Sequence, residues 1–447
     1  MTGLAKQEVF CFCSPSEGGP WAEFGMFRKR FCNFEKVERA QHDGSLLGGY
    51  EEFMQSLNRR QSKILPTGRP PAGRRQSKIL KFYGVKFVLL ETMFAQVDCP
   101  DILAPEELDQ YLERGWFRMG QTIFTTNFLN FKSHFYSAIW LRIPLGQLIR
   151  DKTHQKLLKK NHLFRIQIQR ATITPEKEAL FSTYRKSISF EASASIHTLL
   201  FGKGNHNVYN TQEVNLFDGD KLIASGFFDL GKKSAAGISS FYDPAYKKYT
   251  LGKYLIYLKV DYCKKIGLQY FYPGYFVPGY SLFDYKLEIG KPVLQYLEFT
   301  SSTWKPVAGF SKPLAPLQMM IDKLQQLQNF LMKNGIESKI LKYEFFDANL
   351  IPELEGIVLF DFPIFLSCIG LSEENPIVFD VRDSHYHWIK CKSVWASTSS
   401  SNPEDTYSSH VFKFDHGIFS AELPDAMGAV IADELRSQGK MLRTKSG

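Results

Sequence analysis

The clearest pattern of apolar and polar positions lies between residues 250 and 277, where a helical repeat is followed at once by a strand. The apolar stripe of this helix is formed by Leu251, Leu255, Leu258 and Tyr262. Thr250 is a candidate N-cap, and Gly267 is placed to end the helix before a strand over 268–277. Another strand pattern covers 235–242. The three elements predict a strand–helix–strand unit with a parallel pair in the middle of a mixed sheet.

Shorter patterns predict the elements around this unit. A helix begins at Pro105 and ends at Gly115, and another begins after Thr174 as N-cap. Asp218-Gly219-Asp220 predicts a hairpin between strands 213–217 and 222–230. Further strands are expected at 122–128, 135–143 and 164–169, with helices at 145–160 and 316–333.

These elements predict an α+β fold with a mixed central β-sheet flanked by helices. We expect three parts: a basic, repeat-containing segment over 1–92, a main domain over 93–300, and a C-terminal α/β extension or small α+β domain over 301–447. In the first part, RRQSKIL occurs at 59–65 and again at 74–80, around a Pro- and Gly-rich spacer. It is either a disordered basic arm that holds RNA or upstream sequence joined to a chain that begins at Met93. Residues 397–409 predict a polar loop.

Composition narrows the class of protein. No segment approaches the roughly 20 apolar residues that span a bilayer, and seven scattered cysteines fit reduced thiols better than a disulfide framework. We therefore expect a cytoplasmic protein without a membrane partner. The net charge is +9, but much of the excess lies in 1–92. Outside that segment, basic residues gather over 142–170 against one acid, Asp151. This cluster is either an RNA-contacting face or a solvated helix face.

Two features near the strand–helix–strand unit could bind a ligand. Gly252 opens the helix and would let a phosphate approach the backbone amides, although a plain crossover helix has the same pattern. After it, Pro-Gly pairs interrupt an aromatic run over 270–280, so the sheet must splay or end there. Tyr275 and Tyr280 could then form a wall for stacking a base or a side chain, or simply belong to the core.

Metal and cofactor signals are weak. His385 and His387, with Asp383 and Cys391 nearby, could bind a metal if they shared a strand face, but satisfied histidines are the commoner outcome. No Walker loop, HExxH or nucleophile elbow occurs in the sequence. We expect neither a metal nor a cofactor.

Short motifs in this region resemble the arginyl-tRNA–protein transferase family and its bacterial leucyl-transferring relatives, whose C-terminal half is GNAT-like. They keep the family's order over about residues 108–300. They are RGWFRMG at 114–120, FYDP at 241–244, LG at 251–252, IGLQY at 266–270, GY at 274–275 and YK at 285–286. Two departures stand out. The stretch 121–145 contains no cysteine where the family has a pair, and LEIG at 287–290 replaces an Arg-rich stretch.

The resemblance implies a GNAT-like aminoacyl-tRNA–protein transferase. Such an enzyme moves an amino acid, which we expect to be arginine rather than leucine, from charged tRNA to the N-terminal α-amine of an acceptor protein with a specific N-terminal residue. An N-acyltransferase that uses acyl-coenzyme A and a non-catalytic GNAT-like binding module remain alternatives.

Residue roles follow from the same resemblance. Asp243 would read the amine, Tyr275 would line the aminoacyl or adenosine pocket, and Lys286 would contact a phosphate or the oxyanion. Arg118 would anchor the tRNA end or an acidic acceptor side chain. The other predicted substrate-binding residues are Gly252, Gly274, Tyr280 and Tyr285. The predicted tRNA-binding residues are Arg142, Lys156, Lys159, Lys160 and Arg165.

Overall fold

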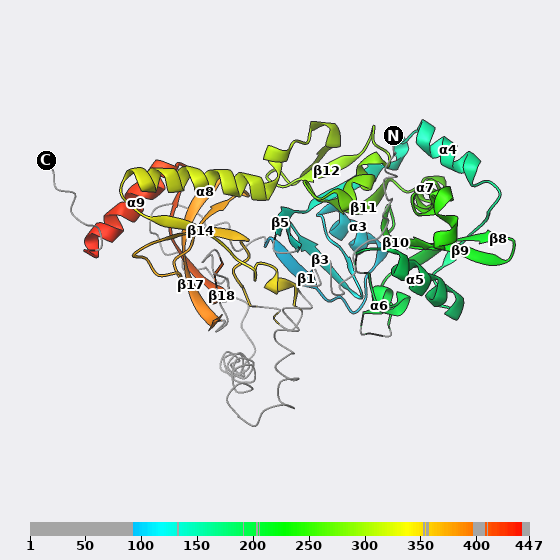
Figure 1. Cartoon of the computed structure of the whole chain (residues 1–447), viewed down its shortest axis with the longest axis horizontal. Helices are drawn as coiled ribbons and strands as arrows, with labels where there is room; N and C mark the ends of the chain where they lie inside the picture. The colour runs from blue at the N-terminus through cyan, green and yellow to red at the C-terminus, as the bar shows by residue number, and fades with distance from the viewer. Residues whose placement is uncertain are drawn as a thin grey trace, which may run out of the picture.

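The computed structural model describes residues 93–439, apart from 132–133, 191, 203, 205, 352–353, 355–356, 397–406 and 409. The predicted segment 1–92 and nearly all of the predicted loop 397–409 therefore lie outside the described residues. The buried apolar side chains form two clusters. One runs from Ala95 to Leu350, and the other combines residues after 316 with Phe94 and Phe128. Figure 1 shows the two parts side by side, with the long helix α8 (Pro316–Lys333) lying over the second part.

The first part is built on an eight-stranded sheet with the order β13-β12-β6-β11-β10-β9-β8-β7. Only β10 and β11 are parallel, and the other pairs described in this sheet are antiparallel. The strands are β6 (Ile139–Pro144), β7 (Arg165–Arg170), β8 (Thr211–Asp218), β9 (Lys221–Leu230), β10 (Ser234–Tyr242), β11 (Tyr270–Phe276), β12 (Gln295–Glu298) and β13 (Thr303–Pro306).

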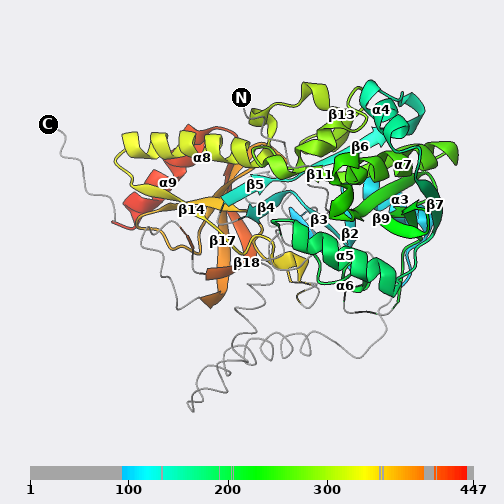
Figure 2. The ribbon, with the colours of Figure 1, turned by 45° about the vertical axis from the view of Figure 1, so that its right-hand side comes forward.

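Helices cover both faces of this sheet, as Figures 1 and 2 show. On one face lie α4 (Lys152–Lys160) and α7 (Leu251–Lys265), with Tyr262 of α7 against Phe228. On the other lie α5 (Pro175–Ser187) and α6 (Ile196–Phe201), with Phe181 of α5 against Phe241. The 3₁₀-helical segments are η2 (Leu145–Gln147), η3 (Pro244–Tyr249), η4 (Ser281–Glu288), η5 (Val307–Gly309), η6 (Lys312–Leu314) and η7 (Ala348–Leu350).

Smaller sheets lie beside the large one. β1 (Ala95–Asp98), β3 (Thr122–Thr126) and β2 (Phe117–Met119) form one, in the order β1-β3-β2, next to α3 (Pro105–Glu113). β4 (Phe128–Phe131) and β5 (His134–Ser137) form a two-stranded sheet whose Phe128 belongs to the second core.

The second part is a five-stranded antiparallel sheet, in the order β14-β15-β16-β17-β18, packed against two helices. α8 contacts α9 and strands β14 to β16, while α9 contacts β18. The elements are α8 (Pro316–Lys333), β14 (Ser338–Lys342), β15 (Ile364–Cys368), β16 (Ile377–Asp380), β17 (His385–Ala396), β18 (His410–Ala421) and α9 (Pro424–Ser437).

Most predicted elements are confirmed. The hairpin forms between β8 and β9 with Gly219 at φ 58°, the parallel pair is β10–β11, and the predicted helix 316–333 is α8. Two predictions are wrong. Residues 145–160 form the short turn η2 and then α4, because the Asp151 side chain accepts from the His154 N–H and starts a new helix. The predicted cap Thr250 has left-handed φ and ψ of 58° and 42°, and its side chain makes no capping bond.

No helix in the described part of the chain is long and apolar enough to cross a bilayer.

Candidate active site

The central parallel pair opens into a fork. β10 and β11 pair only through three residues each, from Ser234 opposite Tyr270 to Ala236 opposite Tyr272. Beyond them both strands continue, but each changes register with its outer neighbour: β10 between Gly237 and Ser239, and β11 between Phe271 and Gly274. The splay predicted from the Pro-Gly interruption is therefore present. Bulges of this kind bend a strand away from its neighbour.

A buried lysine from α7 fills the bulge on β10. The Lys259 Nζ donates to the Ser239 carbonyl at 2.6 Å, the Phe227 carbonyl at 3.0 Å and the Ser240 hydroxyl at 3.0 Å, and the residue is 2% exposed. Gly226 leaves space for it, since a Cβ there would lie 2.9 Å from Nζ. Lys259 was not among the residues predicted from the sequence. The signal was a lysine four residues after Leu255, in the row of apolar positions of α7.

One side of the fork ends at Asp243, directly after β10. Asp243 caps η3 by accepting from the Ala245 N–H at 3.0 Å, and it accepts from the Lys221 Nζ at 2.7 Å. Burial raises the pKa of Asp243, but the bonds from Lys221 and Ala245 outweigh this and leave it below its usual value. The carboxylate is therefore ionised at neutral pH. η3 then leads through Thr250 into α7, where Gly252 is buried in the first turn.

The other side of the fork carries a buried ammonium in an aromatic cluster. The Lys286 Nζ, on a residue 1% exposed, donates to the Tyr275 carbonyl at 2.7 Å. It lies 5.0 Å from the Tyr275 ring centroid and 4.9 Å from that of Phe283. The structure thus brings Tyr275 and Lys286 together, while Asp243 lies at the end of the opposing strand.

The remaining predicted substrate-binding residues on this side surround that cluster. Tyr280 stacks on Phe131 at 4.8 Å and lies 6.0 Å from Phe283. Gly274 is the buried residue at the register change of β11, with φ 87°, and Tyr285 is half-buried in η4. The predicted ring wall is therefore packed against neighbouring aromatic side chains.

Arg118 lies apart from the fork, in a buried ion pair at the other end of the sheet. Its Nη1 donates to Asp229 at 2.9 Å and to Thr211 at 2.8 Å, and its Nε donates to the Gly120 carbonyl at 2.7 Å. Burial raises the pKa of Asp229, and Arg118 offsets only part of that rise. These bonds hold the guanidinium on the protein, so substrate binding by Arg118 remains a prediction.

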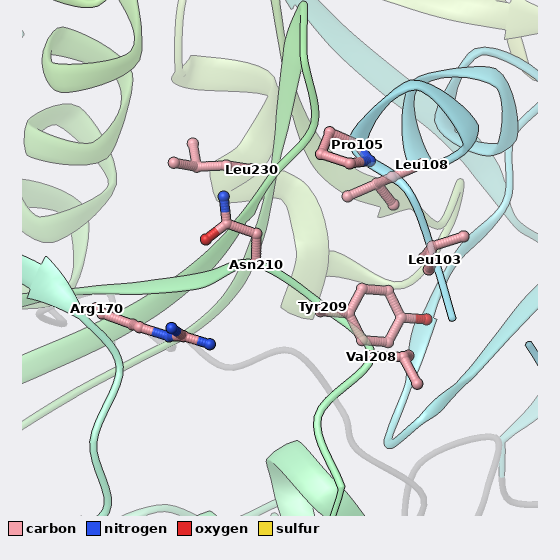
Figure 3. Close-up of a pocket in the computed structure, with 8 residues that line it drawn as sticks. All are labelled: Leu103, Pro105, Leu108, Arg170, Val208, Tyr209, Asn210 and Leu230. Atoms are coloured by element: carbon pink, nitrogen blue, oxygen red, sulfur yellow. The ribbon is translucent and has the colours of Figure 1, made fainter. Parts of the chain in front are cut away.

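A cavity of about 230 Å³ lies beside this ion pair, lined by apolar residues from the start of α3 and from β9. Figure 3 shows Arg170 across from Leu103, Leu108 and Tyr209. The Tyr209 ring also lies 4.3 Å from the Arg118 guanidinium carbon, so it separates the cavity from the buried charge.

The predicted tRNA-binding residues fall on separate surfaces. Lys156, Lys159 and Lys160 are exposed on α4. Arg165 is exposed on the edge strand β7, where its guanidinium carbon lies 4.1 Å from the Phe217 ring. Arg142 is half-buried on β6 between Tyr270 and Trp304, and donates to Gln295 at 2.8 Å. The sheet order separates β6 from β7 by five strand spacings, or roughly 24 Å, so Arg142 and Arg165 do not share one site.

One group of side chains in the second part could hold a metal by its chemistry. Asp380, Asp383 and His387 have ligand atoms within 4.8 Å of one another. However, Arg382 donates to both oxygens of Asp380, and the His387 Nε2 lies 2.9 Å from Asp383. These bonds give each group a partner from the protein itself.

Comparisons with known proteins find similarity in the part of the chain that contains the fork. A family model described as arginine-tRNA-protein transferase, C terminus, matches residues 176–294, which include α7 and both strands of the fork. An aspartate/glutamate leucyltransferase of Leptospira interrogans is 32% identical over 192 residues, which cover 42% of this chain and 73% of that protein. An aspartate/glutamate leucyltransferase of Vibrio cholerae is 26% identical over 203 residues, which cover 44% and 83%.

Similarity to solved structures is weak. The C-terminal domain of a putative lysylphosphatidylglycerol synthetase from Agrobacterium fabrum aligns with a TM-score of 0.27 and 12% identity, covering 35% of this chain and 52% of that one. The ribosomal-protein-S18-alanine N-acetyltransferase from Escherichia coli aligns with a TM-score of 0.18. Scores this low carry no argument.

Proposed function

The chain belongs to the aminoacyl-tRNA–protein transferase family, and from this premise we propose that the fork between β10 and β11 is where it transfers an amino acid from charged tRNA to the α-amine of an acceptor protein. The observation that carries the proposal is the fork itself. A parallel pair opens beside the start of α7, with a buried ammonium on one arm and an ionised carboxylate at the end of the other. The same divergence supports a GNAT-like cradle as the fold of this part.

The reaction needs no covalent bond between the protein and the substrate, because the amine attacks the ester directly. The amine lone pair attacks the ester carbonyl, the bond to the ribose oxygen breaks, and the proton lost by the amine ends on that oxygen. An α-amine has a pKa of about 7.7–8.0, so a useful fraction is neutral at physiological pH. Positioning and stabilisation of the oxyanion should therefore supply most of the rate.

Two predicted residues suit these tasks. Asp243 is ionised and half-buried, so it could hold the acceptor's ammonium group before the proton is lost. The Lys286 ammonium is buried at 1% exposure, and in such a low-dielectric site its charge acts strongly on a nearby oxyanion. Lys286 also fixes the backbone of Tyr275, which we assign to the wall of the aminoacyl pocket.

The names of the relatives support a choice of donor and acceptor. Both are named for leucyl transfer to aspartate or glutamate, so leucyl transfer to an acidic N-terminal residue is the first candidate. Arginyl transfer, the expectation from sequence, is the second, and the description of the family model favours it.

A substrate panel tests the proposal. The protein is incubated separately with labelled Leu-tRNA, Arg-tRNA and acetyl-coenzyme A, each with peptides that begin with Asp, Glu, Arg or Lys. The expected result is label from an aminoacyl-tRNA on the peptides beginning with Asp or Glu. Label from acetyl-coenzyme A alone, or no transfer from either tRNA, would contradict it.

A further inference from the structure

A second cavity, of about 500 Å³, lies between the start of α4 and the end of α7. Its size falls in the range of small-ligand sites. The charged residues that line it are Arg150, Lys264 and Lys265, against the single acid Asp261. None of these residues belongs to the fork.

The acid in this cavity is already neutralised. Asp261 lies 3.0 Å from the Arg150 Nη2 and 3.0 Å from the His154 Nε2. Lys264 donates to the Leu148 carbonyl at 2.5 Å, which is a neutral partner. Lys265 is exposed and makes no ion pair among the described residues. The cavity therefore keeps a net positive charge, which a bound anion would neutralise.

A row of lysines connects this cavity to the fork. α4 starts at the cavity, and at its other end the Lys160 ammonium donates to the Lys248 carbonyl in η3, directly before α7. α4 thus runs antiparallel to α7, because its start contacts Asp261 near the end of α7. Its exposed lysines, Lys152, Lys156 and Lys159, follow one side at helical spacing, and α4 contains no acid. The helix spans about 13 Å.

We propose that the cavity and this row of lysines form a second site on the enzyme, which binds the sugar-phosphate backbone of the donor RNA and directs its aminoacylated end to the fork. The inference rests on the proposed function for the identity of the ligand. Lysines spaced along a surface suit a phosphodiester chain, because each can neutralise one phosphate without reading a base. Coenzyme A also carries phosphates, so the test must separate the two sources.

The variant Lys156→Gln/Lys265→Gln tests the site, with Lys333→Gln/Lys339→Gln as its control. The control removes the same charge from exposed lysines of the second part. The Kd for uncharged tRNA is measured by fluorescence anisotropy over a range of KCl concentrations. We expect the Kd of the test variant to be roughly tenfold higher than that of the wild type. The slope of log Kd against log salt should be smaller by about 1.4, since two phosphate contacts are lost and each contributes about 0.7. The control should match the wild type.

Binding of uncharged tRNA does not depend on transfer, so the two proposals fail separately. A normal Kd and slope in the test variant, with transfer intact, would overturn the RNA site and leave the proposed function standing. If the test variant bound tRNA more weakly but the wild type transferred no amino acid, the RNA site would stand and the proposed function would be overturned. If the test variant lost polyglutamate binding as much as tRNA binding, the surface would attract anions in general. If coenzyme A competed with tRNA for the wild type but not for the test variant, the cavity would belong to coenzyme A. Either result would overturn the RNA site.

Discussion

The fork depends on one buried lysine at the residue scale. Lys259 donates to two carbonyls and a hydroxyl at the bulge of β10, and Gly226 is the residue that makes room for it. A buried ammonium is stable only where its donors are satisfied, so this arrangement fixes the bulge at one place along the strand. Lys259 therefore acts as a positioning residue for the arm of the fork that ends at Asp243.

Gly226→Ala should destabilise the fold by about 1–3 kcal/mol, the usual cost of overpacking. The new methyl group would lie 2.9 Å from both the Lys259 Nζ and the Ser239 carbonyl oxygen. Gly146→Ala is the matched control, because a Cβ there meets no heavy atom within 4 Å. Urea denaturation measures the free energy of unfolding of both variants. Equal stability of the two would show that Lys259 is not tightly held.

The sequence could supply candidate residues for the site but not their contacts. Tyr275 and Lys286 were identified by short motifs, yet the bond between them depends on how η4 folds back onto β11, which no local pattern encodes. Arg118 was selected in the same way, and its partners Thr211 and Asp229 lie 93 and 111 residues away. Such long-range pairs cannot be read from spacing.

At the scale of elements, the strained entry to α7 is the feature that the sequence pattern did not predict. Thr250 has a left-handed conformation, which is unfavourable for a β-branched residue by roughly 1–2 kcal/mol. An N-cap residue usually has an extended backbone, but η3 precedes Thr250 without a break and sets its backbone. Local hairpin and helix signals were predictive because they depend on adjacent residues alone.

Thr250→Gly should raise the free energy of unfolding by up to about 1 kcal/mol, because glycine adopts the left-handed conformation without steric cost. The greater conformational freedom of glycine in the unfolded state offsets part of this gain. Thr183→Gly, at an exposed position in the interior of α5, is a matched control that should lower the free energy of unfolding, because glycine is unfavourable within a helix. Thermal unfolding checks both. A loss of stability in Thr250→Gly would show that Thr250 is not strained.

At the scale of the whole molecule, a buried carboxylate joins the two parts. The Phe94 N–H, at the start of the described chain, donates to Asp361 at 2.5 Å, and Arg382 lies 4.2 Å from the Phe94 ring. Burial raises the pKa of Asp361 to about 6, although Arg382 opposes the rise. The folded state therefore holds a proton on Asp361 more tightly than the unfolded state, whose carboxylates titrate near 3.9.

This shift predicts a pH dependence of stability. Between about pH 4 and 6 the folded state binds more protons, so the contribution of Asp361 is largest below pH 4 and is lost as pH rises through 6. Relative to Asp361→Asn, which does not titrate, the wild type should lose about 2–3 kcal/mol between pH 4 and 7. Urea denaturation across this range checks it. Parallel curves for the two proteins would contradict the raised pKa.

The sequence could not predict how the parts are arranged. Strand order in the large sheet places β6 beside β11 and leaves β7 at the edge, so a basic cluster that is continuous over 142–170 is divided between two surfaces. Local signals identify strands, but their order depends on contacts between distant segments. The fork was predictable because its two strands and helix are consecutive in the chain.

The central claim is that aminoacyl transfer takes place at the fork, and single-turnover transfer from charged tRNA to a peptide with an acidic N-terminus tests it most directly. Lys286→Met keeps the unbranched shape and most of the length of the side chain but removes its charge, while Lys291→Met removes an exposed lysine paired with Glu288 on the surface. The account predicts a rate about 10²–10³ lower for Lys286→Met, the usual effect of losing an oxyanion partner, and an unchanged rate for Lys291→Met. Equal rates for the two variants, with both proteins folded by circular dichroism, would contradict it.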